Sequence, residues 1–231
     1  MLDTPESAIL RRFVTPQRLA RMEGVLAQRT RYITVAVEDL FQPHNGSAVL
    51  RSCDAFGVQD VHIVENRNPW RVNPGVELGT AQWLSINRYR NPRIEPEGSP
   101  VVGPVEQTEL CLTELRRRGY RIVATTPHRE GNSPHRIDLE GGPMALLFGT
   151  EKEGLTETAL AAADEYLAIP MVGFVESLNI SVSAAVTLHT LSARLRESTL
   201  PWGLSEGEQQ ELFTAWLRRD VKHAEEILKR G

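Results

Sequence analysis

Three stretches of the sequence combine amide, hydroxyl, carboxylate and guanidinium side chains with glycines. They occupy residues 43–57, 147–154 and 169–183. Arg51 is the cation of the first stretch. Because a guanidinium has a pKa above about 12, it is better suited to gripping an anion or steadying a developing negative charge than to removing a proton. The three stretches are therefore the candidates for chemistry.

Each stretch taken alone also fits a purely structural role. Polar residues before a helix are typical N-caps, an arginine can pair with an aspartate three residues on, and glycines serve turns. The residues open to these interpretations are Asn45 or Ser47 as the cap of one helix, Ser177 or Asn179 as the cap of another, Arg51 with Asp54 as a pair, and Gly149 and Gly154 as turn residues.

The elements that must position these stretches alternate between strand and helix. Short apolar, β-branched runs predict strands buried on both faces, and the segments between several of them predict helices. The strands are expected at 32–37, 61–64, 121–125, 144–148 and 166–169, with a further one at 83–89; the helices are expected at 47–56, 107–118 and 156–163. This alternation predicts an α/β domain around a parallel sheet.

The ends of the chain are predicted to be helical. Helices are expected within 4–13 and over 17–29, the second following Thr15 as N-cap and Pro16 in the first turn. A long helix is expected over 178–197, a break at 201–203 and helical material over 205–230, whereas 91–104 is predicted to be a surface loop.

The length and composition of the chain limit the kinds of protein that it can be. With 231 residues, 41% of them hydrophobic, one main domain is expected. The net charge is −4, but residues 1–31 hold six arginines and three acidic residues, a net +3. Neither Cys53 nor Cys111 has a partner at metal-ligand spacing, so no zinc is expected. The sequence has no charged-then-apolar leader and no 18-residue apolar run, so we expect a cytoplasmic protein without a membrane partner.

The common nucleotide-binding fingerprints are absent. The predicted first strand runs into residues 38–45, which contain no glycine, and no G-x-x-x-x-G-K-[ST] occurs anywhere. The sequence therefore disfavours a dehydrogenase, a P-loop NTPase and a methyltransferase of the ordinary Rossmann type.

Jointly, the three stretches resemble the motifs of the SpoU/TrmH group of SPOUT RNA 2'-O-methyltransferases. Those motifs read N-x-[SG]-A-[IV]-[LI]-R-[TS], F-G-x-E-x-x-G and I-P-M-x-G-x-x-[EQ]-S-L-N-[VI]-S-V, and the sequence matches them in order from Asn45, Phe148 and Ile169. The resemblance covers about residues 18–196, and such a joint match is specific.

The resemblance implies a fold that sequence physics would not have chosen, because true knots are rare. It implies a SPOUT domain over 32–198, in which a parallel sheet flanked by helices is closed by a trefoil knot, with helical extensions over 1–31 and 199–231. It also implies S-adenosylmethionine (AdoMet) as cofactor, RNA as partner and a homodimer with the active site near the subunit interface.

The resemblance also assigns roles by motif position. Arg51 matches the catalytic arginine and Asn45 the asparagine that accompanies it. The other catalytic candidates are Glu151, Ser177 and Asn179; the cofactor-binding candidates are Thr125, Gly149, Ile169, Met171 and Leu178.

The implied chemistry is consistent with these residue types. A ribose hydroxyl must lose its proton as it attacks the sulfonium methyl group. We expect Arg51 to position an RNA phosphate and lower the pKa of that hydroxyl, rather than to act as a simple base. Because the methyl group leaves a sulfur that is already cationic, no metal is expected.

The stretches around Asn45 and Arg51 are most similar to the TrmH branch, which methylates the D-loop guanosine, position 18, of tRNA. The N-terminal arginines fit that branch, with Arg18 and Arg21 expected to contact RNA. Glu176 departs from the glutamine of many tRNA enzymes and is typical of ribosomal-RNA relatives. An rRNA 2'-O-methyltransferase and an RNA-binding protein of the same fold without catalysis therefore stay open as alternatives.

Overall fold

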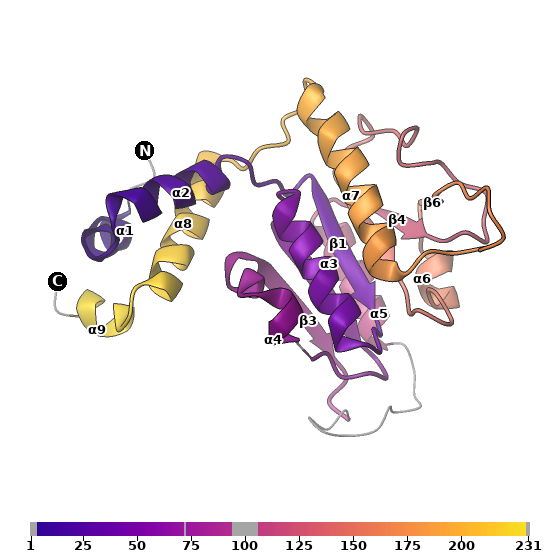
Figure 1. Cartoon of the computed structure of the whole chain (residues 1–231), viewed down its shortest axis with the longest axis horizontal. Coiled ribbons are helices and arrows are strands. Elements are labelled where there is room, and N and C mark those ends of the chain that lie inside the picture. The colour runs from indigo at the N-terminus through magenta and orange to yellow at the C-terminus, as the bar shows by residue number, and fades with distance from the viewer. Residues whose placement is uncertain (1–3, 72, 94–105, 230–231) are drawn as a thin grey trace. The chain divides into compact units, whose positions relative to one another are not determined.

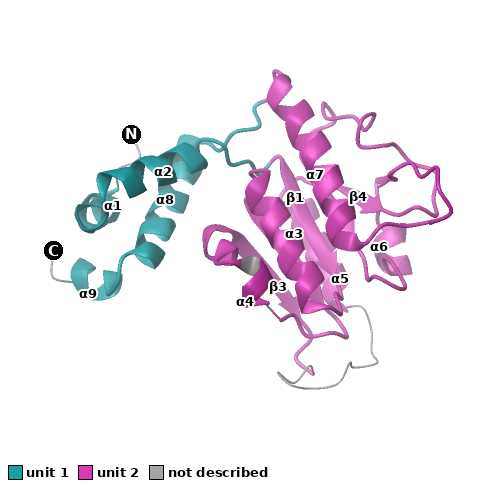
Figure 2. Ribbon diagram, in the orientation of Figure 1, with its two compact units in different colours: residues 1–31, 201–231 teal, residues 32–200 magenta. Residues whose placement is uncertain are grey.

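The computed structural model describes residues 4–71, 73–93 and 106–229. The chain divides into two compact units, one made of residues 1–31 and 201–231 and the other of residues 32–200 (Figure 2).

The larger unit is built on a six-stranded sheet, parallel throughout, in the order β3-β2-β1-β5-β4-β6. Its strands are β1 (Ile33–Glu38), β2 (Asp60–Glu65), β3 (Ser85–Arg90), β4 (Arg121–Thr125), β5 (Met144–Phe148) and β6 (Glu165–Leu167). All residues of β1, β2 and β5 are buried, as their apolar runs predict for central strands covered on both faces. The six predicted strands are thus confirmed, but those at 83–89 and 166–169 are edge strands, so the second of these is not buried on both faces as expected.

Helices cover both faces of this sheet. On one face, Leu112 and Leu115 of α5 (Glu106–Arg117) and Ala159 of α6 (Glu157–Ala161) pack with alternate strand residues such as Ala145 and Leu147. The other face carries α3 (Pro43–Ala55) and α7 (Ile180–Glu197), which lie side by side in Figure 1. Two short elements, α4 (Pro74–Glu77) and a 3-10 turn at Thr80–Trp83, lead into β3.

The starts of two helices test the capping interpretations. Helix α3 begins at Pro43, and its N-cap Gln42 makes no side-chain capping bond, so Asn45 and Ser47 lie inside the helix and the capping interpretation is wrong for both. Asn179 does cap α7, because its side chain accepts a hydrogen bond from the Ser181 backbone N–H. Most of the predicted loop at 91–104 falls outside the described residues.

The smaller unit is helical, as predicted for the chain ends. It contains α1 (Pro5–Leu10), a 3-10 turn at Arg11–Phe13, α2 (Pro16–Leu26), α8 (Glu206–Asp220) and α9 (Ala224–Leu228). Thr15 caps α2, with Pro16 in its first turn. Helix α8 packs against α1 and α2. The two terminal segments therefore form one unit with its own buried residues, among them Leu10, Phe213 and Trp216.

The knot stays a prediction. Arg194 of α7 donates hydrogen bonds to the carbonyls of Pro134 (2.7 Å) and Ile137 (2.9 Å). Helix α7, the last helix of the larger unit, is therefore bonded to the loop between β4 and β5. A threaded C-terminal segment would need contacts of this kind.

Candidate active site

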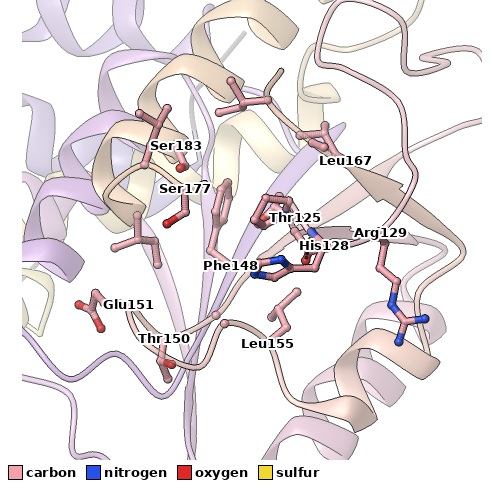
Figure 3. A pocket seen from close by; sticks show the side chains of 18 of the residues that line it. Thr125, His128, Arg129, Phe148, Thr150, Glu151, Leu155, Leu167, Ser177 and Ser183 are labelled. Atoms are coloured by element: carbon pink, nitrogen blue, oxygen red, sulfur yellow. Dashed lines mark hydrogen bonds between the residues drawn. The ribbon is translucent and has the colours of Figure 1, made fainter. Parts of the chain in front are cut away.

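A cavity of about 520 Å³ lies at the carboxyl ends of β4, β5 and β6 (Figure 3). The loops that follow these strands line it, together with the segment that leads into α7. In a parallel sheet the carboxyl ends of the strands are the usual place for a nucleotide-like ligand. Residues of the second and third motifs therefore meet at a site of the expected kind.

The five predicted cofactor-binding residues all line this cavity: Thr125, Gly149, Ile169, Met171 and Leu178. Thr125 lies at the end of β4, and its hydroxyl donates to the Leu147 carbonyl at 2.7 Å. The fold thus brings together residues that are more than 50 positions apart.

The loop after β5 is compact because of its two glycines. A Cβ on Gly149 would lie 2.0 Å from the carbonyl carbon of Gly154, so no side chain fits there. Gly154 adopts a positive φ of 71°, which favours glycine. The backbones of Thr150 and Gly154 bond to each other in both directions, at 2.9 and 3.1 Å. Gly154 is thus a turn residue, whereas Gly149 permits a close approach of two backbone segments.

Three of the predicted catalytic residues form a hydrogen-bonded network that joins the three motifs. The Nδ2 of Asn45 donates to Oε1 of Glu151 at 2.7 Å, and Nδ2 of Asn179 donates to Oδ1 of Asn45 at 3.1 Å. Asn45 is buried, whereas Glu151 is half-buried and lines the cavity. The network therefore holds a carboxylate at the cavity wall.

The two other predicted catalytic residues lie differently. Ser177 lines the cavity and is exposed, and Figure 3 shows it on the same wall as Ser183. Arg51 does not line the cavity; it is exposed on α3 and its Nη1 donates to the Val76 carbonyl at 3.3 Å. Six helical residues turn the chain by about 600°, so Asn45 and Arg51 point in directions about 120° apart.

One set of charged residues near the site was missed by the sequence reasoning. Asp39, directly after β1, accepts the backbone N–H groups of Asn66 and Arg67 at 2.8 Å each. Arg67 in turn donates to Glu153 of the second motif at 2.8 Å, and this bond, with help from Asp39, raises the pKa of Arg67. Because Asp39 and Arg67 both follow strands, the strand-end rule could have found them.

The arginines of the terminal unit are largely engaged within it. Arg18 pairs with Asp220 at 2.7 Å, and Arg11 pairs with Glu23 at 2.6 Å. Arg21 is exposed and makes no hydrogen bond or ion pair with the residues that the structure describes. Of the two predicted RNA contacts, Arg21 is therefore the more available.

Two observations on the described residues concern metals and membranes. Within it, no group of three or more histidine, cysteine, aspartate or glutamate side chains is placed to hold a metal ion. No described helix is long and apolar enough to cross a membrane.

Comparisons with known proteins bear on what this site does. Residues 99–189 match the model of the SpoU rRNA Methylase family. The tRNA (guanosine(18)-2'-O)-methyltransferase of Borreliella burgdorferi is 38% identical over 93% of this chain and 91% of its own. The enzyme of the same name from Escherichia coli K12 is 33% identical over 87% of this chain and 82% of its own.

A solved structure agrees with these relatives. The TrmH/SpoU tRNA modifying enzyme of A. aeolicus superposes with a TM-score of 0.73 at 29% identity, over 89% of this chain and 98% of that chain. Sequence, fold and the joined motifs thus lead to one assignment: the chain belongs to the SpoU/TrmH family of RNA methyltransferases.

Proposed function

We propose that this chain methylates the ribose 2'-hydroxyl of guanosine 18 in tRNA with AdoMet as methyl donor, and that it does so in the cytoplasm. The observation that carries the proposal is the network of Asn45, Glu151 and Asn179, which unites the three motifs at the cavity wall. The names of the relatives from B. burgdorferi and E. coli supply the nucleotide and its position.

The cavity fits the cofactor. Its volume of about 520 Å³ lies within the range of small-ligand pockets, and the close packing of Gly149 on Gly154 leaves backbone rather than side chain at its wall. AdoMet supplies an electrophilic methyl group on a sulfonium cation. Thr125, Gly149, Ile169, Met171 and Leu178 would hold it.

The polar network would receive the ribose. Asn45 occupies one carboxylate oxygen of Glu151 and so fixes the orientation of the carboxylate. The second oxygen is then left to accept a hydrogen bond from a ribose hydroxyl. A fixed acceptor of this kind orients the attacking oxygen and helps to draw off its proton.

Arg51 would act on the phosphate beside that ribose. Its contact with the Val76 carbonyl is long, so the guanidinium can exchange it for a bidentate phosphate contact. A phosphate held in this way would place the ribose, and the nearby positive charge would stabilise the developing alkoxide.

We also propose that two copies of the chain pair through an apolar surface of the larger unit. This surface consists of Val172, Phe174 and Val175 before α7, and Val182 and Val186 one turn apart on it, all of them exposed. Exposed apolar residues gathered in this way are typical of protein interfaces.

The dimer is tested by mass in solution. Val182→Asp should convert a dimer to a monomer in sedimentation experiments at micromolar concentration, because a charge would be buried at the interface. The control is Leu110→Asp, which alters an exposed leucine of α5 and should leave the dimer intact. A wild-type chain that sediments as a monomer would contradict the interface.

Labelled AdoMet tests the reaction. We expect label in a tRNA transcript, no label in the same transcript with 2'-deoxyguanosine at position 18, and unchanged turnover with EDTA. Label in rRNA alone would instead support the rRNA 2'-O-methyltransferase that Glu176 suggests. Binding of tRNA without label in either RNA would identify a non-catalytic protein.

A pair of arginine variants tests the role of Arg51. Arg51→Lys should lower turnover at least about tenfold, since lysine cannot form the planar bidentate contact. Arg117→Lys, at an exposed arginine of α5, is the matched control and should keep full activity. Near-normal turnover of Arg51→Lys would remove the bidentate role.

A further inference from the structure

The cavity has a buried part and an exposed part with different chemistry. Five of its lining residues are buried, and four of these are apolar: Phe148, Leu155, Leu167 and Ile180. The fifth is Thr187 of α7, which is 1% exposed. Four of the charged lining side chains, Arg129, Lys152, Glu153 and Glu157, are exposed, and Glu151 is half-buried.

The Thr187 hydroxyl is exceptional for a threonine in a helix. Such hydroxyls commonly bond to the carbonyl four residues back, as Thr190 of the same helix does with Val186 at 3.0 Å. The buried hydroxyl of Thr187 has no hydrogen-bond partner among the residues that the structure describes. A buried hydroxyl without a hydrogen-bond partner destabilises the folded chain. Because Thr187 lines the cavity, a ligand bound there could supply the partner.

We infer that Thr187 is a cofactor-binding residue whose hydroxyl bonds to the adenosine half of AdoMet. Adenine has a flat apolar body and a polar edge, which suits four apolar side chains and one hydroxyl. The amino-acid half carries two charges and belongs at the exposed part of the cavity, where the charged side chains and water are. This inference rests on the proposed use of AdoMet and adds a residue outside the three motifs.

Binding calorimetry with two ligands tests the inference. S-adenosylhomocysteine contains both halves of the cofactor, whereas 5'-methylthioadenosine lacks the amino-acid half. In the nearly isosteric Thr187→Val variant we expect the dissociation constants of both ligands to rise by the same factor, about tenfold for one lost hydrogen bond in a buried site. Thr187→Ser, which keeps the hydroxyl, should bind both nearly as wild type does.

Stability without ligand gives an independent readout. Because Thr187→Val removes a buried hydroxyl that has no partner among the described residues, the unliganded variant should melt about 2–4 °C higher than wild type. Thr190→Val, the matched control, removes a hydroxyl that is bonded to Val186, and should neither raise the melting temperature nor weaken either ligand.

The possible results separate this inference from the proposed function. Unchanged affinity of Thr187→Val for both ligands, or a loss confined to S-adenosylhomocysteine, would overturn the assignment to the adenosine half. If wild type binds S-adenosylhomocysteine but does not methylate tRNA, the proposed substrate fails and Thr187 keeps its role. If wild type binds neither ligand, the proposed cofactor and the inference both fail.

Discussion

Asn45→Asp tests the network at the cavity wall with little change of shape. Asn45 is 1% exposed and donates to Glu151 at 2.7 Å. Aspartate has no N–H to donate, so the variant would bring a second carboxylate against Glu151. At that separation two unit charges repel by about 6 kcal/mol for an effective dielectric constant of about 20. Taking up one proton avoids this repulsion and costs about 4 kcal/mol at pH 7 for a carboxyl with a pKa near 4.

The sign of the pH dependence follows from this proton. The pKa of the carboxyl pair in the folded variant is raised above its unfolded value of about 4. The penalty is therefore absent below about pH 4 and grows by about 1.4 kcal/mol per pH unit until the raised pKa is reached. At pH 7 the free energy of unfolding should be lower than that of wild type by about 4 kcal/mol, and about 3 kcal/mol of this should return by pH 5.

Urea unfolding between pH 5 and pH 8, at one protein concentration, measures the effect. Asn45→Ala is the control, because it removes the hydrogen bonds to Glu151 and from Asn179 without adding a charge and should cost about 2 kcal/mol at every pH. For each variant, the quantity to follow is its difference from wild type in the free energy of unfolding. If this difference is as independent of pH for Asn45→Asp as for Asn45→Ala, the contact between Asn45 and Glu151 is refuted. Methyl transfer should be lost in both variants.

Three further predictions concern other parts of the larger unit. Burial, together with the nearby charge of Arg118, lowers the pKa of His62 to about 4. The free energy of unfolding of the wild type should therefore fall by up to about 3 kcal/mol as the pH falls from 6.5 to 4. In urea titrations, His62→Gln should make this dependence on pH weaker. Gly46→Val should cost about 2 kcal/mol and shift tryptophan fluorescence, because a Cβ there would lie 2.0 Å from the Trp70 ring. A double-mutant cycle of Arg67→Met and Glu153→Gln should give a coupling of about 1 kcal/mol in unfolding experiments, since both side chains are partly exposed; zero coupling would remove this bridge.

The central strands of the sheet were predictable from sequence because they are buried on both faces. The run over β5 is apolar at every position, and all five of its residues are buried. The start of α3 was harder to predict, because the polar residues Asn45 and Ser47 look like caps although they serve tertiary contacts. Asn45 bonds to Glu151, and the Ser47 hydroxyl accepts the backbone N–H of Asn73 at 2.8 Å. Local spacing cannot distinguish a cap from a residue buried within the first turns of a helix.

Nothing in the local sequence predicted that the two terminal segments pack together as one unit. The apolar residues of α2 and α8 repeat as in any amphipathic helix, and that pattern shows which face is buried without naming the partner. Arg29 illustrates the limit: its sequence neighbours suggest a solvated arginine, yet it is buried, with its guanidinium 5.5 Å from the centre of the Trp216 ring. A contact between residues nearly 190 positions apart follows from the fold alone.

In the site, too, the sequence identified residues, whereas only the fold shows which of them are in contact. The motifs identified Asn45, Glu151 and Asn179 as candidates, but only the fold shows that they bond to one another and that Arg51 lies elsewhere on α3. Thr187 carried no signal in the sequence at all, because a threonine in a long helix usually bonds to its own backbone. Thr187 stands out because it is buried, lies beside a cavity and has no hydrogen-bond partner for its hydroxyl in the described part of the chain, and each of these features depends on residues distant in the chain. Motif matching therefore finds the residues that a family shares, whereas unmet hydrogen-bonding groups can reveal contacts that are specific to one chain.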